Sequence, residues 1–171
     1  TDLSGASSAG SLNLTSAGYI QDNNNATIDI TNNATFDAAT TITLNEDASN
    51  DLDVGGRAYF IAANGIAVGA AGTANFGSLQ FSSAGHVSIY EDSDMFLVNN
   101  SNAGSLLLNA TGSITDAVGA SLVVSTTAEF VATSLIDLAD QVGDVLTVTG
   151  SAFFDAGSTI AVGVLGSANC G

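Results

Sequence analysis

Ala34-Thr35-Phe36-Asp37-Ala38 and Ala128-Glu129-Phe130-Val131-Ala132 are two occurrences of one pattern, separated by 94 positions. At the same offset, residues 11–77 align without a gap with residues 105–171, and 26 of the 67 aligned positions are identical. Nearly all of the identical positions are apolar residues, Gly or Ala. An ungapped match of this length indicates a duplication. Because repeats define the architecture of the folds that contain them, this repeat is the first guide to the fold.

Each copy of the repeat divides again into shorter stretches. Leu14, Phe36 and Phe60 begin equivalent stretches, which follow one another at nearly equal steps. These steps predict a stack of seven coils, each of roughly 21 to 27 residues, as in other solenoid repeats. The predicted coils are residues 11–32, 33–56, 57–77, 78–104, 105–126, 127–150 and 151–171. The longest of them, 78–104, is inserted between the two copies.

Within each coil, apolar residues alternate with polar ones in short bursts. The coil 78–104 contains three bursts, Leu79-x-Phe81, Val87-x-Ile89 and Phe96-x-Val98. Alternation with a period of two, interrupted by turn residues, is typical of half-buried strands. One coil cannot bury its own apolar face, so stacked coils must share a core. We therefore predict an all-β, right-handed parallel β-helix (a β-solenoid) with three short strands per coil, as a single domain over residues 1–171.

Two other all-β architectures also contain many short strands. Folds assembled from hairpins do not need a fixed repeat period, and a β-propeller requires blades of about 40–45 residues. The short step from Leu14 to Phe36 and the long repeat over residues 11–77 fit neither architecture. A helical fold is excluded because no segment carries an apolar stripe at positions i, i+3, i+4 and i+7.

The charge of the chain is strongly one-sided. It contains 17 acidic residues and a single base, Arg57, for a net charge of −16. Nucleic acids and anionic membranes attract basic side chains, so we expect neither as a partner. No apolar run reaches the ~18 residues that a membrane span needs, so we expect no membrane insertion. The one cysteine, Cys170, aligns with Phe76 and is predicted to be a small buried residue.

The two ends of the chain resemble interior parts of the repeat. Residues 1–10 are interpreted as the tail of a preceding repeat unit, because they correspond to residues 166–171 of the second copy. Neither end carries the atypical polar coil that usually caps a solenoid. We therefore expect a segment of a longer repetitive chain, or a subunit that assembles end to end with its neighbours.

Two motifs carry a resemblance to a known group of proteins. They are Gly-Ser-Leu-x-Leu-x-x-x-Gly-x-Ile, which begins at Gly10, and Ala-x-Phe-x-Ala-x-x-x-Ile-x-Leu, which begins at Ala34. Over residues 11–171 the chain resembles the repeats of filamentous-haemagglutinin-like proteins and other giant bacterial surface adhesins. The resemblance implies the shaft of an extracellular or cell-surface protein. It carries over no catalytic or receptor-binding residues, and the expected function is structural, as an adhesin shaft or an extracellular filament subunit.

Carboxylates are the main candidates for a binding site. Five of the seven predicted coils carry one just after the second strand, which predicts a single acidic row along one corner of the solenoid. The row consists of Asp22, Glu46, Asp47, Glu91, Asp92, Asp116 and Asp140. Calcium prefers oxygen ligands and could bridge such neighbours. The alternative is a solvated acidic edge, because salt screens the repulsion between exposed charges.

The most favourable calcium site in this row combines Glu91 and Asp92 with Asp94, and Glu46 with Asp47 forms a weaker candidate. No established calcium-loop motif is present, so these candidates rest on spacing alone. A β-helix module that binds calcium or surface glycans is therefore the alternative function.

Enzymatic activity is not expected. Hydrolysis of a glycoside requires two carboxylates about 5 to 9.5 Å apart, a spacing that Asp51 and Asp53 could satisfy. However, sugar-binding clefts usually contain aromatic platforms, and the chain has no Trp and only three Tyr. It also lacks a Ser-His-Asp set, a phosphate-binding glycine loop and zinc-ligand spacing. We expect no resident cofactor other than the calcium considered above.

Overall fold

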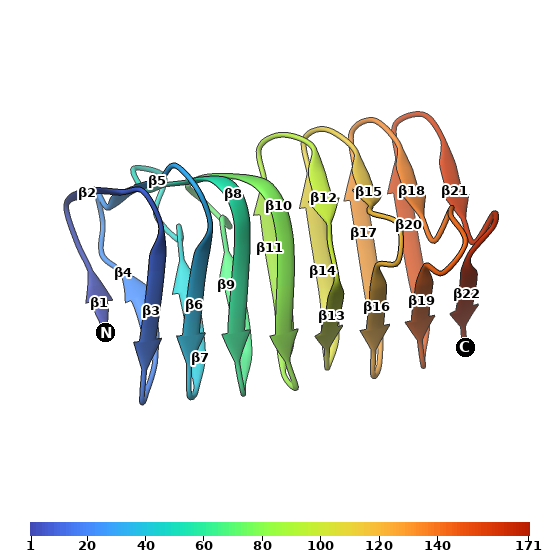
Figure 1. The fold of residues 1–171 in the computed structure, drawn as a ribbon, viewed down its shortest axis with the longest axis horizontal. Helices are drawn as coiled ribbons and strands as arrows, with labels where there is room; N and C mark the ends of the chain where they lie inside the picture. Colours follow the sequence, from blue (N-terminus) through green and yellow to red (C-terminus); the bar gives the residue numbers. More distant parts are fainter.

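The computed structural model describes residues 1–171 and consists of strands joined by turns, with no helix. The strands wind into a rod with the two termini at opposite ends (Figure 1). Every strand pair is parallel, including pairs far apart in the sequence such as β11 with β14. The predicted parallel β-solenoid is confirmed.

None of the protein's segments is a helix long and apolar enough to cross a membrane.

One side of the rod is a sheet of eight strands, each contributed by a different turn. In order along the rod, they are β1 (Asp2–Leu3), β4 (Ile20–Asp22), β7 (Thr41–Leu44), β9 (Gly65–Val68), β11 (His86–Glu91), β14 (Ser105–Ala110), β17 (Ala128–Ala132) and β20 (Ala152–Ala156). The solenoid therefore has about eight turns. This is one more than the seven predicted coils, because residues 1–10 also form strands of the rod.

The other sides form one sheet of 14 strands, centred on the two long strands β8 (Asp51–Ala62) and β10 (Thr73–Ser83). Both long strands run across two sides of the rod, whereas the turns before and after them use two shorter strands. On the N-terminal side the shorter strands are β2 (Ala6–Ala9), β3 (Leu12–Ser16), β5 (Thr27–Ile30) and β6 (Ala34–Ala38). On the C-terminal side they are β12 (Met95–Leu97), β13 (Asn100–Ala103), β15 (Ile114–Asp116), β16 (Ser121–Val124), β18 (Ile136–Leu138), β19 (Val145–Val148), β21 (Ile160–Val162) and β22 (Ser167–Cys170).

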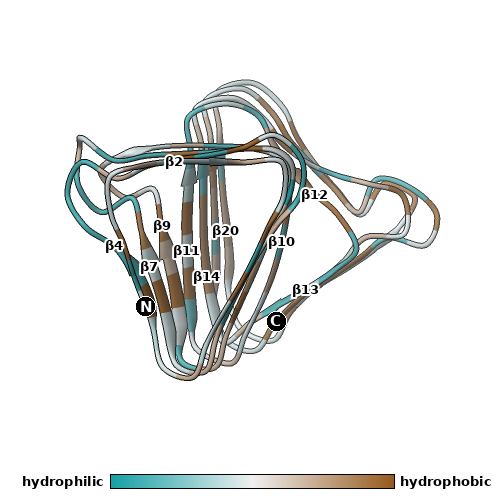
Figure 2. Cartoon of the chain, turned by 60° about the vertical axis from the view of Figure 1, so that its left-hand side comes forward, coloured by the Kyte–Doolittle hydropathy of each residue, from teal (hydrophilic) through white to brown (hydrophobic).

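The predicted alternation of apolar and polar residues matches the burial pattern of most strands. In β6, for example, Ala34, Phe36 and Ala38 are buried while the residues between them are not. The predicted burst Phe96-x-Val98 is wrong by one residue, because Met95 and Leu97 face the core in β12 and Phe96 is 39% exposed. The inward side chains of successive turns form one cluster of 38 buried apolar residues that runs through the rod. The rings of Phe36 and Phe60 stack with centroids 5.2 Å apart, and Phe76 meets Phe60 edge to face. The sheets enclose this core on all sides (Figure 2).

The strand register corrects the predicted coil boundaries. One column of paired residues runs along the eight-stranded sheet through Ile20, Ile42, Ile66, Val87, Leu106, Ala128 and Ala152. The turn from Val87 to Leu106 is the shortest in this column, whereas the predicted coil 78–104 was the longest. The reason is that residues 78–83 complete the preceding turn as the end of β10.

The two copies of the repeat occupy different sides of the rod. Strands β3 and β14 are equivalent in the alignment of the copies, yet β3 belongs to the 14-stranded sheet and β14 to the eight-stranded sheet. Leu12 and Leu79 occupy the same column of paired residues, and three turns separate them. From Leu79 the chain continues to β11 on the next side of the rod, and one further turn leads from β11 to Leu106. The offset is therefore four turns plus one side, and the second copy is rotated about the axis of the rod by one side.

Cys170 is exposed, contrary to its predicted burial. Its equivalent in the first copy, Phe76, is buried because residues of the next turn cover it. Cys170 lies in β22, the last strand, and no further turn packs on it in this structure.

Replacement of Phe60 by Ala should destabilise the protein strongly. Phe60 is fully buried between two other rings, so the substitution removes apolar contacts and leaves a cavity, at a cost of about 3–5 kcal/mol. The matched control is Phe153→Ala on the outer face of β20, where the ring is 57% exposed and we expect a change of about 0.5 kcal/mol. Urea denaturation measures both, and equal losses would contradict the assignment of the core.

Candidate functional site

Three carboxylates come together on the second copy of the repeat. Asp116, Asp140 and Asp144 each place an oxygen within 4.8 Å of the others. Asp116 is the last residue of β15, and the other two lie in the loop between β18 and β19, one turn further along the rod. This loop belongs to a row of loops, one from each of several successive turns, that projects on the right of Figure 2. We call this group the aspartate cluster.

Hydrogen bonds to backbone amides position the carboxylates of the cluster. The backbone N–H of Ala139 donates to Oδ2 of Asp116 at 3.1 Å. Asp144 accepts from Gly119 N–H through Oδ1 at 2.6 Å and from Gln141 N–H through Oδ2 at 2.9 Å. Ala139 and Gly119 both have positive φ angles, 54° and 78°, which turn their N–H groups toward these side chains. The carboxylates thus tie the loops of two successive turns together.

The cluster holds its negative charges in a partly dry environment. Asp144 is only 1% exposed, and one oxygen of Asp116 is buried without a hydrogen-bond partner. Burial raises the pKa of Asp116 to about 6, the charges of Asp144, Asp140 and Asp137 add to this rise, and the Ala139 N–H opposes them. Three carboxylates at this spacing offer hard oxygen ligands of the kind that calcium prefers, and water or backbone carbonyls would complete its coordination.

The first copy has an equivalent corner loop, at another corner of the rod, with one fewer carboxylate. In the alignment of the copies, Asp22, Glu46 and Asn50 correspond to the three members of the aspartate cluster. One backbone bond repeats at equivalent positions, since Asp22 accepts from Asn45 N–H at 2.8 Å. Asn50 accepts from Ala26 N–H at 3.1 Å, one residue after the position that is equivalent to Gly119. A neutral amide therefore supports the first loop where a carboxylate supports the second.

The predicted single acidic row is wrong, because the rotation of the second copy places its acids on another corner. Asp22 and Glu46 follow strands of the eight-stranded sheet, whereas Asp116 and Asp140 follow strands of the 14-stranded sheet. The corner that Asp22 shares continues in the second copy as short turns around Gly112 and Ser134, which bear no acid.

The residues of the preferred predicted calcium site do not come together. Glu91 is buried and accepts the Phe76 N–H at 3.0 Å. Asp94 accepts the Ser113 N–H at 2.7 Å, across the next turn. Glu91, Asp92 and Asp94 therefore do not share a set of ligand atoms like that of the aspartate cluster.

Of the weaker pair, Glu46 is exposed and Asp47 supports its own turn. Asp47 accepts hydrogen bonds from the hydroxyl and the N–H of Ser49, which lower its pKa. Partial desolvation by its neighbours and the charge of Asp22 raise the pKa of Glu46.

Sequence reasoning missed Asp144, the most deeply buried member of the aspartate cluster. The predicted acidic row contains only acids that come just after the second strand of a coil, and Asp144 does not. The alignment of the two copies contained a signal, because Asp144 stands opposite Asn50 in a loop that otherwise differs mainly at its tip.

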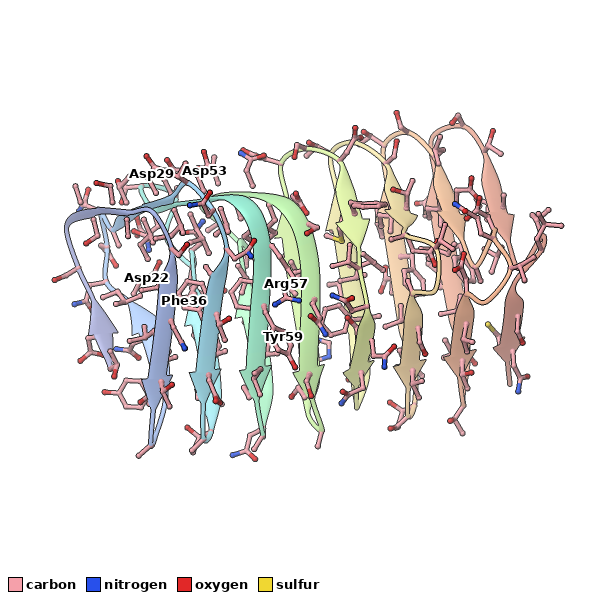
Figure 3. The ribbon with its side chains drawn as sticks, in the orientation of Figure 1. Asp22, Asp29, Phe36, Asp53, Arg57 and Tyr59 are labelled. Carbon is pink, nitrogen blue, oxygen red and sulfur yellow. The ribbon has the colours of Figure 1, made fainter.

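Two further pairs of polar or charged side chains lie on the outer surface. Asp29 of β5 and Asp53 of β8 are directly paired, and their side chains lie close together on the outside (Figure 3). Burial and the nearby Asp29 charge raise the pKa of Asp53. The single base, Arg57, lies against the ring of Tyr59 at 5.6 Å. Neither pair repeats in the second copy, so both are local features of individual turns.

Comparison with known protein families matches residues 1–55 and 84–145 to a family described as "Repeats of unknown function (DUF5649)". The first matched segment covers residues 1–10 and most of the first copy, and the second covers most of the inserted segment and the greater part of the second copy. No curated protein and no solved structure matches the chain.

Asp116→Asn should flatten the pH dependence of stability between about pH 4 and 6. The pKa of Asp116 is raised from 3.8 in the unfolded chain to about 6 in the fold. Its contribution is therefore fully present below pH 4 and is lost as the pH rises through 6. After allowance for solvent screening, we expect the loss to be on the order of 1 kcal/mol.

The free energy of unfolding, measured in urea at pH 4, 5, 6 and 7, tests this expectation. Asp155→Asn, at an exposed carboxyl of β20, is the control. A pH profile of Asp116→Asn that is parallel to that of the unmodified protein would show that Asp116 titrates normally.

Proposed function

The chain belongs to the DUF5649 family of repeats, and we propose that it serves as a rod-like structural segment of a secreted or cell-surface protein, without catalysis. The single observation that carries this proposal is the continuity of the core. One cluster of 38 buried residues extends from Ile20 to Val148, and partly buried apolar residues of the first and last turns pack against it, so stability is distributed along the rod and is not concentrated around a site.

The duplication supports the same function. Two copies of one unit continue a single hydrogen-bonded rod across their junction, even though they face different sides. An architecture of this kind lengthens by adding units, which suits a shaft or a filament. The net charge of −16 keeps neighbouring rods apart and soluble. Together with the resemblance to surface adhesins, the charge favours an extracellular or cell-surface location.

Calcium binding at the aspartate cluster is the second candidate function. It is favoured by the distance of 4.8 Å within which three carboxylate oxygens gather, and by the buried oxygen of Asp116 that accepts no hydrogen bond. A divalent cation would relieve the repulsion between these charges and clamp two successive turns. Such a site would stiffen the rod, so this function is compatible with the structural one.

Electron microscopy of the native protein that contains this chain tests the structural function. At about 4.8 Å per turn, the eight turns should contribute roughly 38 Å to the length of a straight rod. We expect elongated particles or filaments. Compact particles, or turnover of a polysaccharide by the purified protein, would contradict the proposal.

Calorimetric titration with calcium tests the second candidate. We expect binding and a rise in Tm for the unmodified protein, and the loss of both in Asp140→Asn. The matched control is Glu46→Gln at the equivalent position of the first copy, where Asn50 replaces the third carboxylate. Absence of heat and of any Tm change in the unmodified protein would remove this candidate, and an equal loss in both variants would place the site elsewhere.

A further inference from the structure

At the junction between the two copies, one column of paired strands in the 14-stranded sheet comes to an end. Up to this point, residues 6–9, 27–30, 51–54 and 73–76 form a column of directly paired strands. The last member of the column, the start of β10, has no strand paired with it on its other edge. The following turn pairs with β10 only from Leu79 onward. The rotation of the second copy therefore leaves a short edge of β10 whose backbone N–H and C=O groups have no partner strand.

Glu91 and its neighbour Asp92 form hydrogen bonds with two backbone groups of this edge. The carbonyl of Ala74 accepts the N–H of Asp92 at 3.0 Å, and the N–H of Phe76 donates to Oε1 of Glu91 at 3.0 Å. The Glu91 side chain thus takes the place of the carbonyl that a paired strand would supply. It is only 2% exposed, and its second oxygen, Oε2, is buried with no hydrogen-bond partner.

We propose that Glu91 is a proton-controlled lock that fastens the exposed edge of β10, at the end of the first copy, to the inserted turn that follows it. In the closed state Glu91 carries a proton on Oε2 and is neutral, while Oε1 holds the Phe76 N–H. Loss of the proton places a charge on a buried oxygen that no donor reaches, and this charge drives the side chain toward water. The Phe76 N–H then loses its acceptor, and the edge of β10 opens.

No positive group near Glu91 can compensate its charge. The charged groups that act on it, Asp92 and Asp94, belong to its own loop and disfavour its ionisation. The elements packed against it contribute only uncharged residues to the shallow pocket at this point. These residues are Gly69, Gly72 and Ala74 from β10 and the turn before it, and Asn109 and Thr111 from β14 and the turn after it.

Burial raises the pKa of Glu91 from 4.5 to about 8, although the bonds from Phe76 and Ser93 lower it. The folded carboxyl therefore keeps its proton at neutral pH. By linkage, the stability that this proton provides is fully present below pH 4.5 and is lost as the pH rises to 8. Above pH 8 the lock itself titrates, and each further pH unit reduces the protonated fraction about tenfold.

Hydrogen exchange of the Phe76 amide between pH 6.5 and 9.5 tests the proposal, after correction for the intrinsic exchange rate. In the unmodified protein, protection should fall by roughly tenfold or more between pH 8 and 9.5, while amides in the centre of β14 stay protected. Glu91→Gln keeps a neutral acceptor for Phe76 N–H and should remove this pH dependence. Glu129→Gln, at an exposed position of β17, should retain it.

The titration of the Glu91 carboxyl carbon by NMR gives a second readout that does not require a folded variant. We expect a midpoint near pH 8 in the unmodified protein. A midpoint near 4.5, or protection of Phe76 that is equally independent of pH in the unmodified protein and in Glu91→Gln, would overturn the proposal.

Discussion

The rest of this structure depends on one constraint, the parallel hydrogen-bonded stacking of each turn on the one before it. Because paired residues of neighbouring turns lie only about 4.8 Å apart, equivalent positions must suit one another in size and polarity. Inward positions become columns of Ile, Leu, Val and Phe, and corners become columns of small residues. At the corner where Gly85 meets Asn64, a Cβ atom would stand 1.8 Å from a carbonyl oxygen, so only glycine fits there. The small-residue composition of the chain follows from this crowding.

The same constraint makes the rotation between the two copies consequential. A turn must close on itself, but nothing requires the duplicated unit to contain a whole number of turns. The offset between the copies spans four turns and one further side, so each strand of the second copy adopts the pairing partners of a different side. The hydrophobic column tolerates this change because all three sides present the same alternation. The polar corners do not tolerate the change in the same way. At the junction, where a partner strand is missing, the buried carboxyl of Glu91 accepts the backbone N–H of Phe76.

The two copies keep the backbone contacts of their corner loops and differ in charge. Asp22 and Asp116 each accept the N–H of a residue with positive φ one turn further along, Asn45 or Ala139. The exchange of Asn50 for Asp144 then adds a buried carboxylate to the second loop only. A structural motif common to both copies thus becomes a concentrated negative site in one of them. A rod function and a cation site are compatible in this arrangement, because the same loops that could hold the ion also connect successive turns.

The amino-acid sequence by itself determined the class of fold, most strand positions and most of the core. The alternation around Phe36 and Phe130 specifies which residues face inward, and the regular steps of the repeat specify stacking, because both are local properties of the chain. Only the tertiary structure decided which side of the rod each copy faces. That choice depends on how the short turn from Val87 to Leu106 closes, and the apolar pattern is the same on every side. For this reason the acids were predicted to form one row, and the structure separates them into two corners, gathers Asp144 with Asp116, and buries Glu91.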